Sequence, residues 1–281
     1  FDYVSSGGAE MGHGAAYYWR GKSEATQIFT TLPFGLNAME LNGWHYFGGG
    51  MELYRELYED FNLRPYPAGN SGCQMGGWFK KEIKSLEDFK GLKMRIPGIG
   101  AEIINRLGGT AVNMPPGEIM PALQQGVIDA TEWVGPWVDK ISGLHKIAKY
   151  YYGPGIHEPG TANELIMSKD KWQDLPDNLK EIVKNSCHAI YIESLAEFLH
   201  FNSLSLEELK SQHNVKVLNF NSEIMNTMFK ISRSVITEFS ELGEIHKEIY
   251  KSWQNSLIKY NKYQKFSDYG YIKERISSLQ I

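Results

Sequence analysis

The amino-acid sequence predicts an α/β protein with doubly wound sheets, because strand-like and helix-like segments alternate along it. Between Leu92 and Trp133, short apolar runs alternate with segments whose apolar residues recur at helical spacing. Gly108 and Gly126 follow two of the expected helices, at the position where glycine commonly ends a helix. A chain of 281 residues is long enough for two medium-sized domains with a sizeable core.

The individual elements follow from Gly and Pro punctuation and from hydrophobic periodicity. Strands are expected at residues 9–16, 63–67, 92–96, 110–114, 127–133, 163–168 and 215–220. Helices are expected at residues 40–61, 99–107, 117–125 and 175–211, the first of them loosened by three consecutive glycines. After an N-cap at Asn221, the helical pattern runs to about Tyr263 with one interruption at Gly243.

The C-terminal segment, residues 222–281, is expected to be a long helical region that reaches beyond one domain. About 40 helical residues would extend ~60 Å at a rise of 1.5 Å each. Ile245, Ile249, Trp253 and Leu257 form an apolar stripe at three- and four-residue spacing. The stripe either packs on its own domain or meets a partner. The partner is favoured, because no other part of the chain is an obvious cover for it.

The start of the chain resembles a later part of it. Val4 to Glu10 repeats the plan of Leu123 to Asp129, with the end of a helix, a glycine and the start of a strand. This repeat suggests two domains built alike, and predicts that the strand before the first helix is missing from this chain. The first residues contain no Met and no signal-peptide hydrophobic region.

Composition limits the class of protein further. A net charge of −4 gives no indication of a nucleic-acid-binding face. A hydrophobic content of 42% excludes disorder, and no apolar run approaches the ~20 residues that span a bilayer. Cys73 and Cys187 are the two cysteines, and we expect both to be unpaired thiols.

Polar residues at strand ends and turns predict a ligand site. Arg95 stands where an expected strand breaks into a Pro-Gly turn, and a guanidinium held there can meet a carboxylate bidentately. Glu132 follows another expected strand, and such ends of one sheet face the same crevice. Gln74 and Glu158 lie in Gly-rich turns. This pattern is typical of a small anionic ligand held by a fixed cation together with a metal ion.

Longer motifs carry a family resemblance. Residues 69–79, 86–98 and 118–129 resemble the substrate-binding subunits of tripartite ATP-independent periplasmic (TRAP) transporters. The run 130–136, with Tyr151-Tyr152 and Glu158-Pro159-Gly160, is similar to the branch that binds 2-oxo acids and lactate. The resemblance covers essentially the whole chain. It departs from the family in the missing N-terminal strand-helix-strand.

The resemblance implies a two-lobed periplasmic-binding-protein fold with a cleft between the lobes and a long C-terminal helix. Residues 1–64 with 130–157 are expected to form lobe I, and residues 65–129 with 158–221 to form lobe II. Residues 222–281 would span the lobes and form a homodimer by exchange of C-terminal helices, as in relatives of this branch.

The resemblance also implies a role for each candidate site residue. Arg95 would pair with the ligand carboxylate. The side chains of Gln74 and Glu132 and the carbonyl of Trp133 would bind Na⁺ or Ca²⁺ together with the ligand, with Glu158 as the candidate for the last position. All of these ligand atoms are hard oxygens, which suit those two ions.

Two further side chains are candidates for the ligand pocket. Tyr17 and Tyr18 follow the first expected strand, so that one of them could donate a hydrogen bond across the cleft. We select Tyr18, although both could be core residues. Asn163, at the start of another expected strand, is a further polar candidate.

These expectations describe an extracytoplasmic, periplasmic protein that captures a 2-oxo acid such as pyruvate, or lactate, and delivers it to TRAP membrane subunits. A ligand sensor and an enzyme acting on oxo acids are the alternatives. The sequence has no His-Glu-x-x-His, Gly-x-Ser-x-Gly, Walker or dinucleotide-binding motif. His157 beside Glu158 is the one acid/base-like neighbour pair, and a turn histidine is usually solvated. We therefore expect a binding protein.

Overall fold

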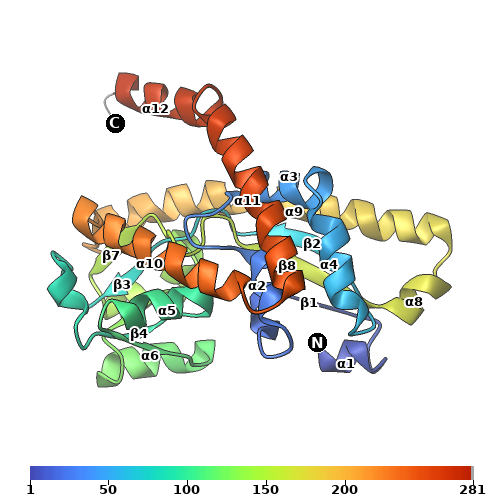
Figure 1. Ribbon diagram of the computed structural model, residues 1–281. Coiled ribbons are helices and arrows are strands. Elements are labelled where there is room, and N and C mark those ends of the chain that lie inside the picture. The colour runs from blue at the N-terminus through green and yellow to red at the C-terminus, as the bar shows by residue number, and fades with distance from the viewer. Residues whose placement is uncertain (280–281) are drawn as a thin grey trace.

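Two separate sheets divide the molecule into two α/β lobes (Figure 1), which confirms the two-lobed architecture expected from the sequence. The computed structural model describes residues 1–279. The sheet of lobe I is antiparallel throughout, in the order β1 (Met11–Gly14), β8 (Ala162–Ser168) and β2 (Leu63–Asn70). Lobe I also contains α1 (Asp2–Ser5), η1 (Ala16–Trp19), η2 (Glu24–Thr26), α2 (Gln27–Thr30), α3 (Ala38–Phe47), α4 (Gly50–Glu59) and α8 (Lys169–Asp174).

Lobe II is built on a mixed six-stranded sheet. Its order is β5 (Thr110–Val112), β4 (Lys93–Arg95), β6 (Ala130–Thr131), β3 (Gly77–Phe79), β7 (Tyr150–Gly153) and β9 (Lys216–Asn219). Its helices are η3 (Leu86–Phe89), α5 (Gly98–Arg106), α6 (Pro116–Gln125), α7 (Pro136–Ile141), η4 (Leu144–Lys146) and α10 (Ser222–Ser240). β3 is antiparallel to both of its neighbours, whereas the β4–β5, β4–β6 and β7–β9 pairs are parallel. The expected all-parallel winding therefore holds only for those three pairs.

Sheet pairing also corrects the expected lobe boundaries. β6 and β7, from the segment 130–157 that we had assigned to lobe I, pair within the sheet of lobe II. β8, from the segment assigned to lobe II, is the central strand of lobe I. Short apolar strands look alike in sequence, and the sheet that each one joins depends on contacts far along the chain. The sequence pattern could therefore identify the strands but not their partners.

A capping box explains where the expected helix 40–61 begins, and a glycine explains why it is divided into two helices. The Asn37 side chain accepts a hydrogen bond from Glu40 N (3.0 Å), and the Glu40 carboxylate accepts one from Asn37 N (2.9 Å), which together begin α3. Gly49 has φ of 88° in the left-handed region, where glycine carries no steric penalty, and it separates α3 from α4.

Two crossing segments and one long helix join the lobes. Residues 71–76 and 154–161 run side by side, since Gln74 N donates to the Glu158 carbonyl (3.1 Å) and Gly155 N donates to the Gln74 carbonyl (2.8 Å). The helix α9 (Asp177–Ser211) extends along both lobes and packs on β2 of one and α7 of the other (Figure 1). This arrangement places the crossing segments at the junction between the lobes.

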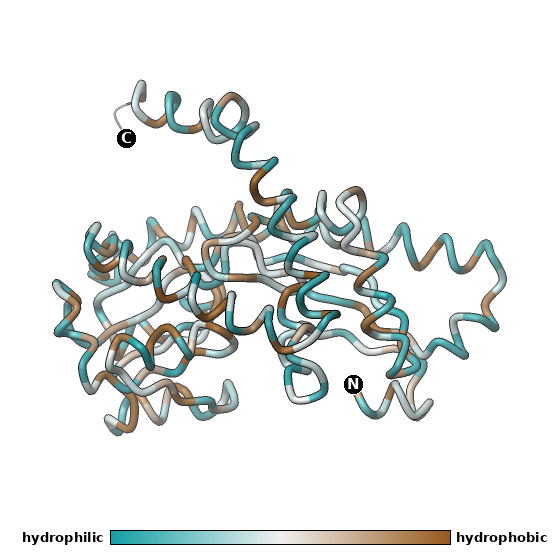
Figure 2. The backbone as a smooth tube through the Cα atoms, in the orientation of Figure 1, coloured by the Kyte–Doolittle hydropathy of each residue, from teal (hydrophilic) through white to brown (hydrophobic). Residues whose placement is uncertain are grey.

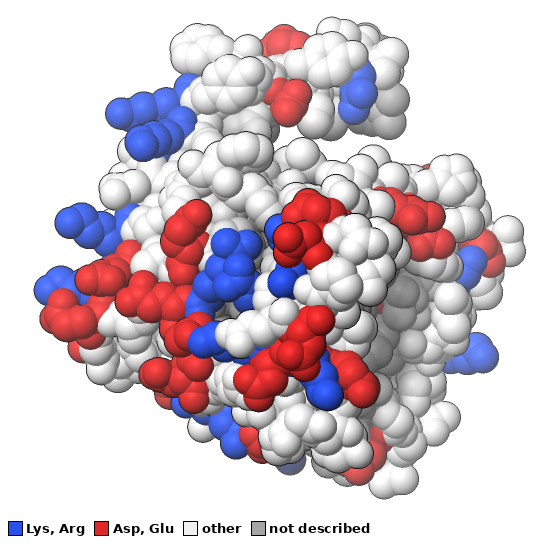
Figure 3. All heavy atoms as spheres, turned by 90° about the vertical axis from the view of Figure 1, so that its right-hand side faces the viewer, with Lys and Arg blue, Asp and Glu red and all other residues white. Residues whose placement is uncertain are grey.

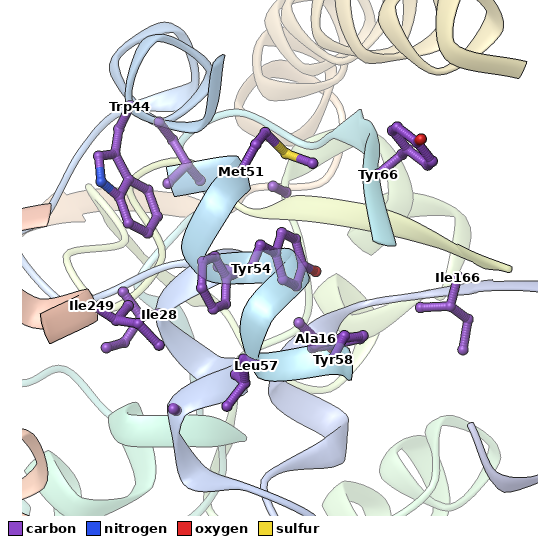
Figure 4. Packing of buried hydrophobic residues seen from close by; sticks show 14 of the residues in the cluster. Ala16, Ile28, Trp44, Met51, Tyr54, Leu57, Tyr58, Tyr66, Ile166 and Ile249 are labelled. Carbon is purple, nitrogen blue, oxygen red and sulfur yellow. The ribbon is translucent and has the colours of Figure 1, made fainter. Parts of the chain in front are cut away.

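The C-terminal helices correct the expected partner for the apolar stripe. α10 packs on α5 in lobe II, and α11 (Glu244–Gln264) crosses to pack on α3 and α4 in lobe I. Ile249 and Trp253 on α11 are 0% and 1% exposed within the single chain. Figure 4 shows Ile249 beside Ile28 in the core of lobe I. The stripe packs at home because it completes that core, so the prediction that it meets a second copy is wrong.

Exposed apolar side chains lie instead beyond α11. The last helix, α12 (Asp268–Leu279), projects away from both lobes (Figure 1). Its apolar positions recur along the projecting segment in Figure 2. Phe266 is 90% exposed, and exposed apolar side chains on α12 are Tyr269, Tyr271, Ile272, Ile276 and Leu279.

Several surface properties follow from the structure. Acidic and basic side chains are interspersed on the face at the lobe I end (Figure 3). Cys73 lies exposed in a crossing segment and Cys187 lies buried in α9, each as a free thiol. Among residues 1–279, no helix combines the length and apolar character needed to cross a membrane.

Candidate functional site

Parallel pairing of β4 and β6 brings Arg95 and Glu132 together. Arg95 pairs in register with Thr131, and Glu132 N donates to the Arg95 carbonyl (2.9 Å). Both side chains leave the carboxyl ends of their strands, where open α/β sheets bind ligands. Arg95 is 4% exposed and Glu132 is 1% exposed, so this is a buried pair at the lobe junction and not a surface ion pair.

The guanidinium of Arg95 is fixed on one side only. Its Nη1 donates to the Glu132 carbonyl (3.0 Å) and to Glu132 Oε2 (3.1 Å), and its Cζ lies 5.3 Å from the ring centre of Trp133. Among residues 1–279, Nε of Arg95 has no hydrogen-bond partner. The guanidinium therefore keeps donor capacity that a ligand carboxylate could use.

The crossing segments supply oxygen atoms to the same region. Gln74 Nε2 donates to Ser71 Oγ and to Thr161 Oγ1, both at 3.2 Å, which fixes the amide orientation. Thr161 Oγ1 in turn donates to Glu158 Oε2 (2.6 Å). Gln74 Oε1 is buried and, within the described part of the chain, accepts no hydrogen bond. Gln74 therefore presents an oriented carbonyl oxygen.

Three buried titratable groups cluster at this point. One ligand atom each from Glu132, His157 and Glu158 lies within 4.8 Å of the others. Glu132 Oε1 and His157 Nε2 are 3.9 Å apart, and neither atom has a hydrogen-bond partner in residues 1–279. With Gln74 Oε1, the two carboxylates form a set of hard oxygens that fits Na⁺ or Ca²⁺. The expected role of the Trp133 carbonyl stays a prediction.

Burial sets the protonation of this cluster. It raises the pKa of Glu132 to about 8, although Arg95 acts to lower it. Burial and the neighbouring Glu132 raise the pKa of Glu158 to about 7. Burial lowers the pKa of His157 below its usual value, which favours the neutral imidazole. Two carboxylates this close repel each other when both are ionised, and a bound cation would remove that repulsion.

Asp139 holds the turn that carries Glu132 and Trp133. Its Oδ1 accepts hydrogen bonds from Val134 N and Gly135 N, both at 3.0 Å. Its Oδ2 accepts from Trp78 Nε1 (2.8 Å) and Tyr151 Oη (2.7 Å). Burial nevertheless raises the pKa of Asp139 to about 6. Asp139 lies in the first turn of α7, where its only sequence signal was an acidic residue near a helix start.

The structure places Tyr17, and not Tyr18, next to the cluster. Tyr17 is half-buried and lines a small cavity with Pro97, Gly100, His157 and Glu158. Tyr18 is 57% exposed at the cleft rim, where its hydroxyl lies 3.4 Å from that of Tyr17. The choice of Tyr18 assumed the alternation of a strand, whereas both residues lie in the 3-10 helix η1.

The role of Asn163 in the site stays a prediction. This residue is half-buried on β8 beside Gly69, where a β-carbon added to that glycine would lie 3.6 Å from Asn163 Nδ2 and 3.7 Å from Ser194 Oγ of α9. In the described chain, no hydrogen bond joins Asn163 to Arg95, Gln74 or Glu132.

The lobes are closed on each other. The cavity beside Tyr17 and Glu158 measures about 10 Å³, room for the centre of about one water molecule. A wider cavity of about 310 Å³, lined by Tyr17, Tyr18, Pro97 and Gly98, lies next to it. A ligand larger than water would therefore reach the cluster from that cavity, or when the lobes separate. His157 and Thr161 belong to this closed site and were not among the residues selected from sequence.

A two-lobed fold with a buried arginine at the lobe junction, beside oxygens that have no partner within residues 1–279, is typical of one class of protein, the extracellular solute-binding proteins. The chain belongs to one family of that class, bacterial extracellular solute-binding protein family 7, which matches residues 1–242. This confirms the resemblance seen in the sequence. Proteins of the family and the similar structures below are binding proteins.

Named relatives and solved structures agree with the family. A monocarboxylate 2-oxoacid-binding periplasmic protein from Nostoc sp. (strain PCC 7120) is 42% identical over 90% of this chain and 69% of its own length. A TRAP periplasmic solute-binding protein from Colwellia psychrerythraea, solved with calcium and pyruvate, has a TM-score of 0.93 and 40% identity. That comparison covers 97% of this chain and 83% of the other.

Two further solved structures are similar. A TRAP periplasmic solute-binding protein from Pseudoalteromonas atlantica, with bound sodium and pyruvate, has a TM-score of 0.92 and 40% identity over 97% of this chain and 83% of its own. A solute-binding protein from Bordetella bronchiseptica, a mixed-occupancy dimer with calcium and picolinate in one site, has a TM-score of 0.95 and 36% identity over 99% of this chain and 83% of its own.

Proposed function

We propose that this protein captures a small monocarboxylate, a 2-oxo acid such as pyruvate, together with Na⁺ or Ca²⁺. One observation carries the proposal: the open edge of the Arg95 guanidinium lies in the same closed junction as the unpaired oxygens of Gln74 and Glu132. Pyruvate and calcium or sodium in the similar solved structures support this assignment.

In this proposal each residue has one role. Arg95 donates to the ligand carboxylate, and Tyr17 donates from lobe I across the cleft. Gln74 Oε1, Glu132, Glu158 and the Trp133 carbonyl surround the cation, which also takes the carboxylate and 2-oxo oxygens of the ligand. Closure of the lobes excludes water and strengthens each of these contacts. The protein binds its ligand and releases it unchanged.

Calorimetry tests this function. Pyruvate should bind in buffer with Ca²⁺ or Na⁺, and propionate should bind much more weakly, because it lacks the 2-oxo oxygen that completes the cation site. Incubation of pyruvate with the protein should leave its concentration unchanged. Equal affinity for propionate, or no binding of any 2-oxo acid with either cation, would overturn the proposal.

We also propose that the protein works in the periplasm and delivers its ligand to the membrane subunits of a TRAP transporter. The family and the periplasmic relative from Nostoc support this. Vesicles carrying the cognate membrane subunits should accumulate labelled pyruvate only when this protein and a cation gradient are present.

A homodimer through α12 completes the proposal. The exposed side chains Phe266, Tyr269, Ile272 and Ile276 lie outside the chain's own core, and burying each large apolar side chain contributes ~1.5–3 kcal/mol. A two-fold pairing would cover both copies equally. Sedimentation should show a dimer for the parent and a monomer for Ile272→Asp, whereas Glu274→Lys on the opposite helix face should stay dimeric. A monomeric parent at micromolar concentration would contradict the dimer.

A further inference from the structure

His157 forms part of the wall between two cavities. It lines the small polar cavity beside Tyr17 and Glu158, and it also lines an apolar cavity inside lobe II. Gly100 of α5 is shared by both cavities in the same way. His157 is 5% exposed, so that both of its sides face the protein interior.

The apolar cavity is already present in the closed protein. It measures about 20 Å³, room for the centres of one or two water molecules. Its walls are apolar and include Phe79, Phe89, Met94, Ile103, Phe220 and Met228. A cavity lined in this way favours an alkyl group over water.

Close packing holds His157 in the wall. A β-carbon added to Gly100 would lie 3.3 Å from His157 Cβ and 2.8 Å from Ile96 Cδ1, so the first turn of α5 lies directly against the histidine. Within residues 1–279, His157 Nε2 makes no hydrogen bond. The size of the ring, more than a polar contact, therefore separates the cavities.

We propose that His157 limits the ligand to 2-oxo acids with a short side chain, an inference that rests on the proposed function. A 2-oxo acid anchored at Arg95 and the cation extends its alkyl group away from these charges. The imidazole stands between that position and the apolar cavity. A methyl or ethyl group stops before the ring, whereas a longer chain meets it and loses affinity.

The decisive experiment compares two 2-oxo acids on variants of His157. Calorimetry in Ca²⁺ buffer gives the dissociation constants of pyruvate and 2-oxopentanoate. The ratio of the two constants measures how strongly His157 restricts the length of the ligand side chain. His157→Ala joins the two cavities and should shift the ratio at least tenfold toward 2-oxopentanoate. His157→Leu has a side chain of similar size and should keep the ratio of the parent.

The ratio separates this length restriction from other effects of His157. A lost contact to the shared 2-oxo carboxylate would weaken both ligands alike and leave the ratio unchanged. His157→Val, which also shortens the side chain, serves in place of His157→Ala if thermal melting shows that the latter does not fold. His145→Ala, which removes a buried histidine outside both cavities, is the control and should leave the ratio unchanged.

Three outcomes count against specific claims. A parent-like ratio in a folded His157→Ala or His157→Val variant overturns the claim that His157 limits ligand length, and leaves the proposed function intact. If His157→Leu shifts the affinity ratio as much as His157→Ala does, the polarity of the side chain and not its size sets the preferred ligand length. That result also overturns the claim that the size of His157 limits the ligand. If the unmodified protein binds neither acid, both the proposed function and the length restriction by His157 are overturned.

Discussion

Two buried carboxylates, one in lobe I and one at the lobe junction, differ in how many of their oxygen atoms accept hydrogen bonds. In lobe I, Glu164 is 1% exposed and accepts hydrogen bonds from Trp19 Nε1 (2.5 Å), Tyr58 Oη (3.2 Å) and the Tyr54 hydroxyl. At the lobe junction, Glu132 is equally buried, but its Oε1 accepts no hydrogen bond from residues 1–279. Both carboxylates are desolvated, and only one is fully compensated by its own chain.

This difference separates a structural role from a binding role. A buried polar atom without a partner costs about 1–3 kcal/mol, which a folded protein retains where a ligand later supplies the missing contact. The unpaired atoms at the junction come from Gln74, Arg95, Glu132 and His157, which belong to separate segments of the chain. Their convergence on one point is an arrangement that the proposed ligand and cation would complete.

The largest expected effect comes from replacing Arg95, the buried arginine at the junction. Arg95→Ala or Arg95→Lys should weaken pyruvate binding by about 2–5 kcal/mol, roughly 30- to 5000-fold, because a desolvated carboxylate loses its bidentate partner. Calorimetry measures the loss. Arg106→Lys is the matched control, because its ion pairs with Glu102 and Glu238 lie on the surface. If Arg95→Lys binds within a few-fold of the parent, the ligand carboxylate has another anchor.

Removal of the metal ion should give the next largest effect. Glu132 and Glu158 lie close together in a poorly solvated junction, and a ligand carboxylate adds a third negative charge. Like charges about 4 Å apart repel by about 4 kcal/mol at an effective dielectric constant of 20. Without the cation, burial raises the pKa of Glu132 to about 8, so that protonation relieves most of this repulsion at neutral pH. Chelated, sodium-free protein should therefore bind pyruvate roughly tenfold more weakly or worse, and Ca²⁺ or Na⁺ should restore the affinity. Full affinity without either ion would leave the unpaired oxygens of Gln74 and Glu132 unexplained.

The sequence predicted which polar residues meet at the junction better than it predicted their exact positions. Arg95, Gln74, Glu132 and Glu158 were selected because cationic, amide and acidic residues at strand ends and turns are unusual, and the structure brings them together. Tyr18 was selected from two neighbouring tyrosines whose direction the sequence does not show. The chain forms a 3-10 helix there, and Tyr17 lines the cavity. A one-residue shift of this kind depends on local backbone geometry that side-chain pattern does not reveal.

Long-range contacts explain the other errors. The strand character of residues 163–168 was visible, but its place at the centre of lobe I depends on pairing with β1 and β2. The apolar stripe of α11 was also visible, yet its cover is α3 and α4, about 200 residues earlier. Periodicity shows which face of a helix is apolar and cannot show which surface covers that face.

A third prediction tests the compensated carboxylate through pH. Burial raises the pKa of Glu164 to about 7, above its unfolded value near 4.5. Between these pH values the folded state binds more protons than the unfolded state, so Glu164 lowers the free energy of unfolding as pH rises. Glu164→Gln cannot ionise. From pH 5 to pH 8, its stability in urea should therefore gain up to about 3 kcal/mol relative to the parent. Parallel stability curves would mean that Glu164 is already ionised at pH 5.

The smallest expected effect concerns Thr161, which connects the two crossing segments. Its hydroxyl accepts from Gln74 Nε2 and donates to Glu158 Oε2, so that it orients two proposed cation ligands without touching the ion. Thr161→Val keeps the shape and removes about 1 kcal/mol of hydrogen bonding, roughly a fivefold loss of pyruvate affinity. If Thr161 acts on the cation ligands, the loss should shrink when the Ca²⁺ concentration is raised to saturation. Thr227→Val, at an exposed helix position, should bind as the parent does. A loss that Ca²⁺ does not reduce would mean that Thr161 supports the fold of the crossing segments and not the cation site.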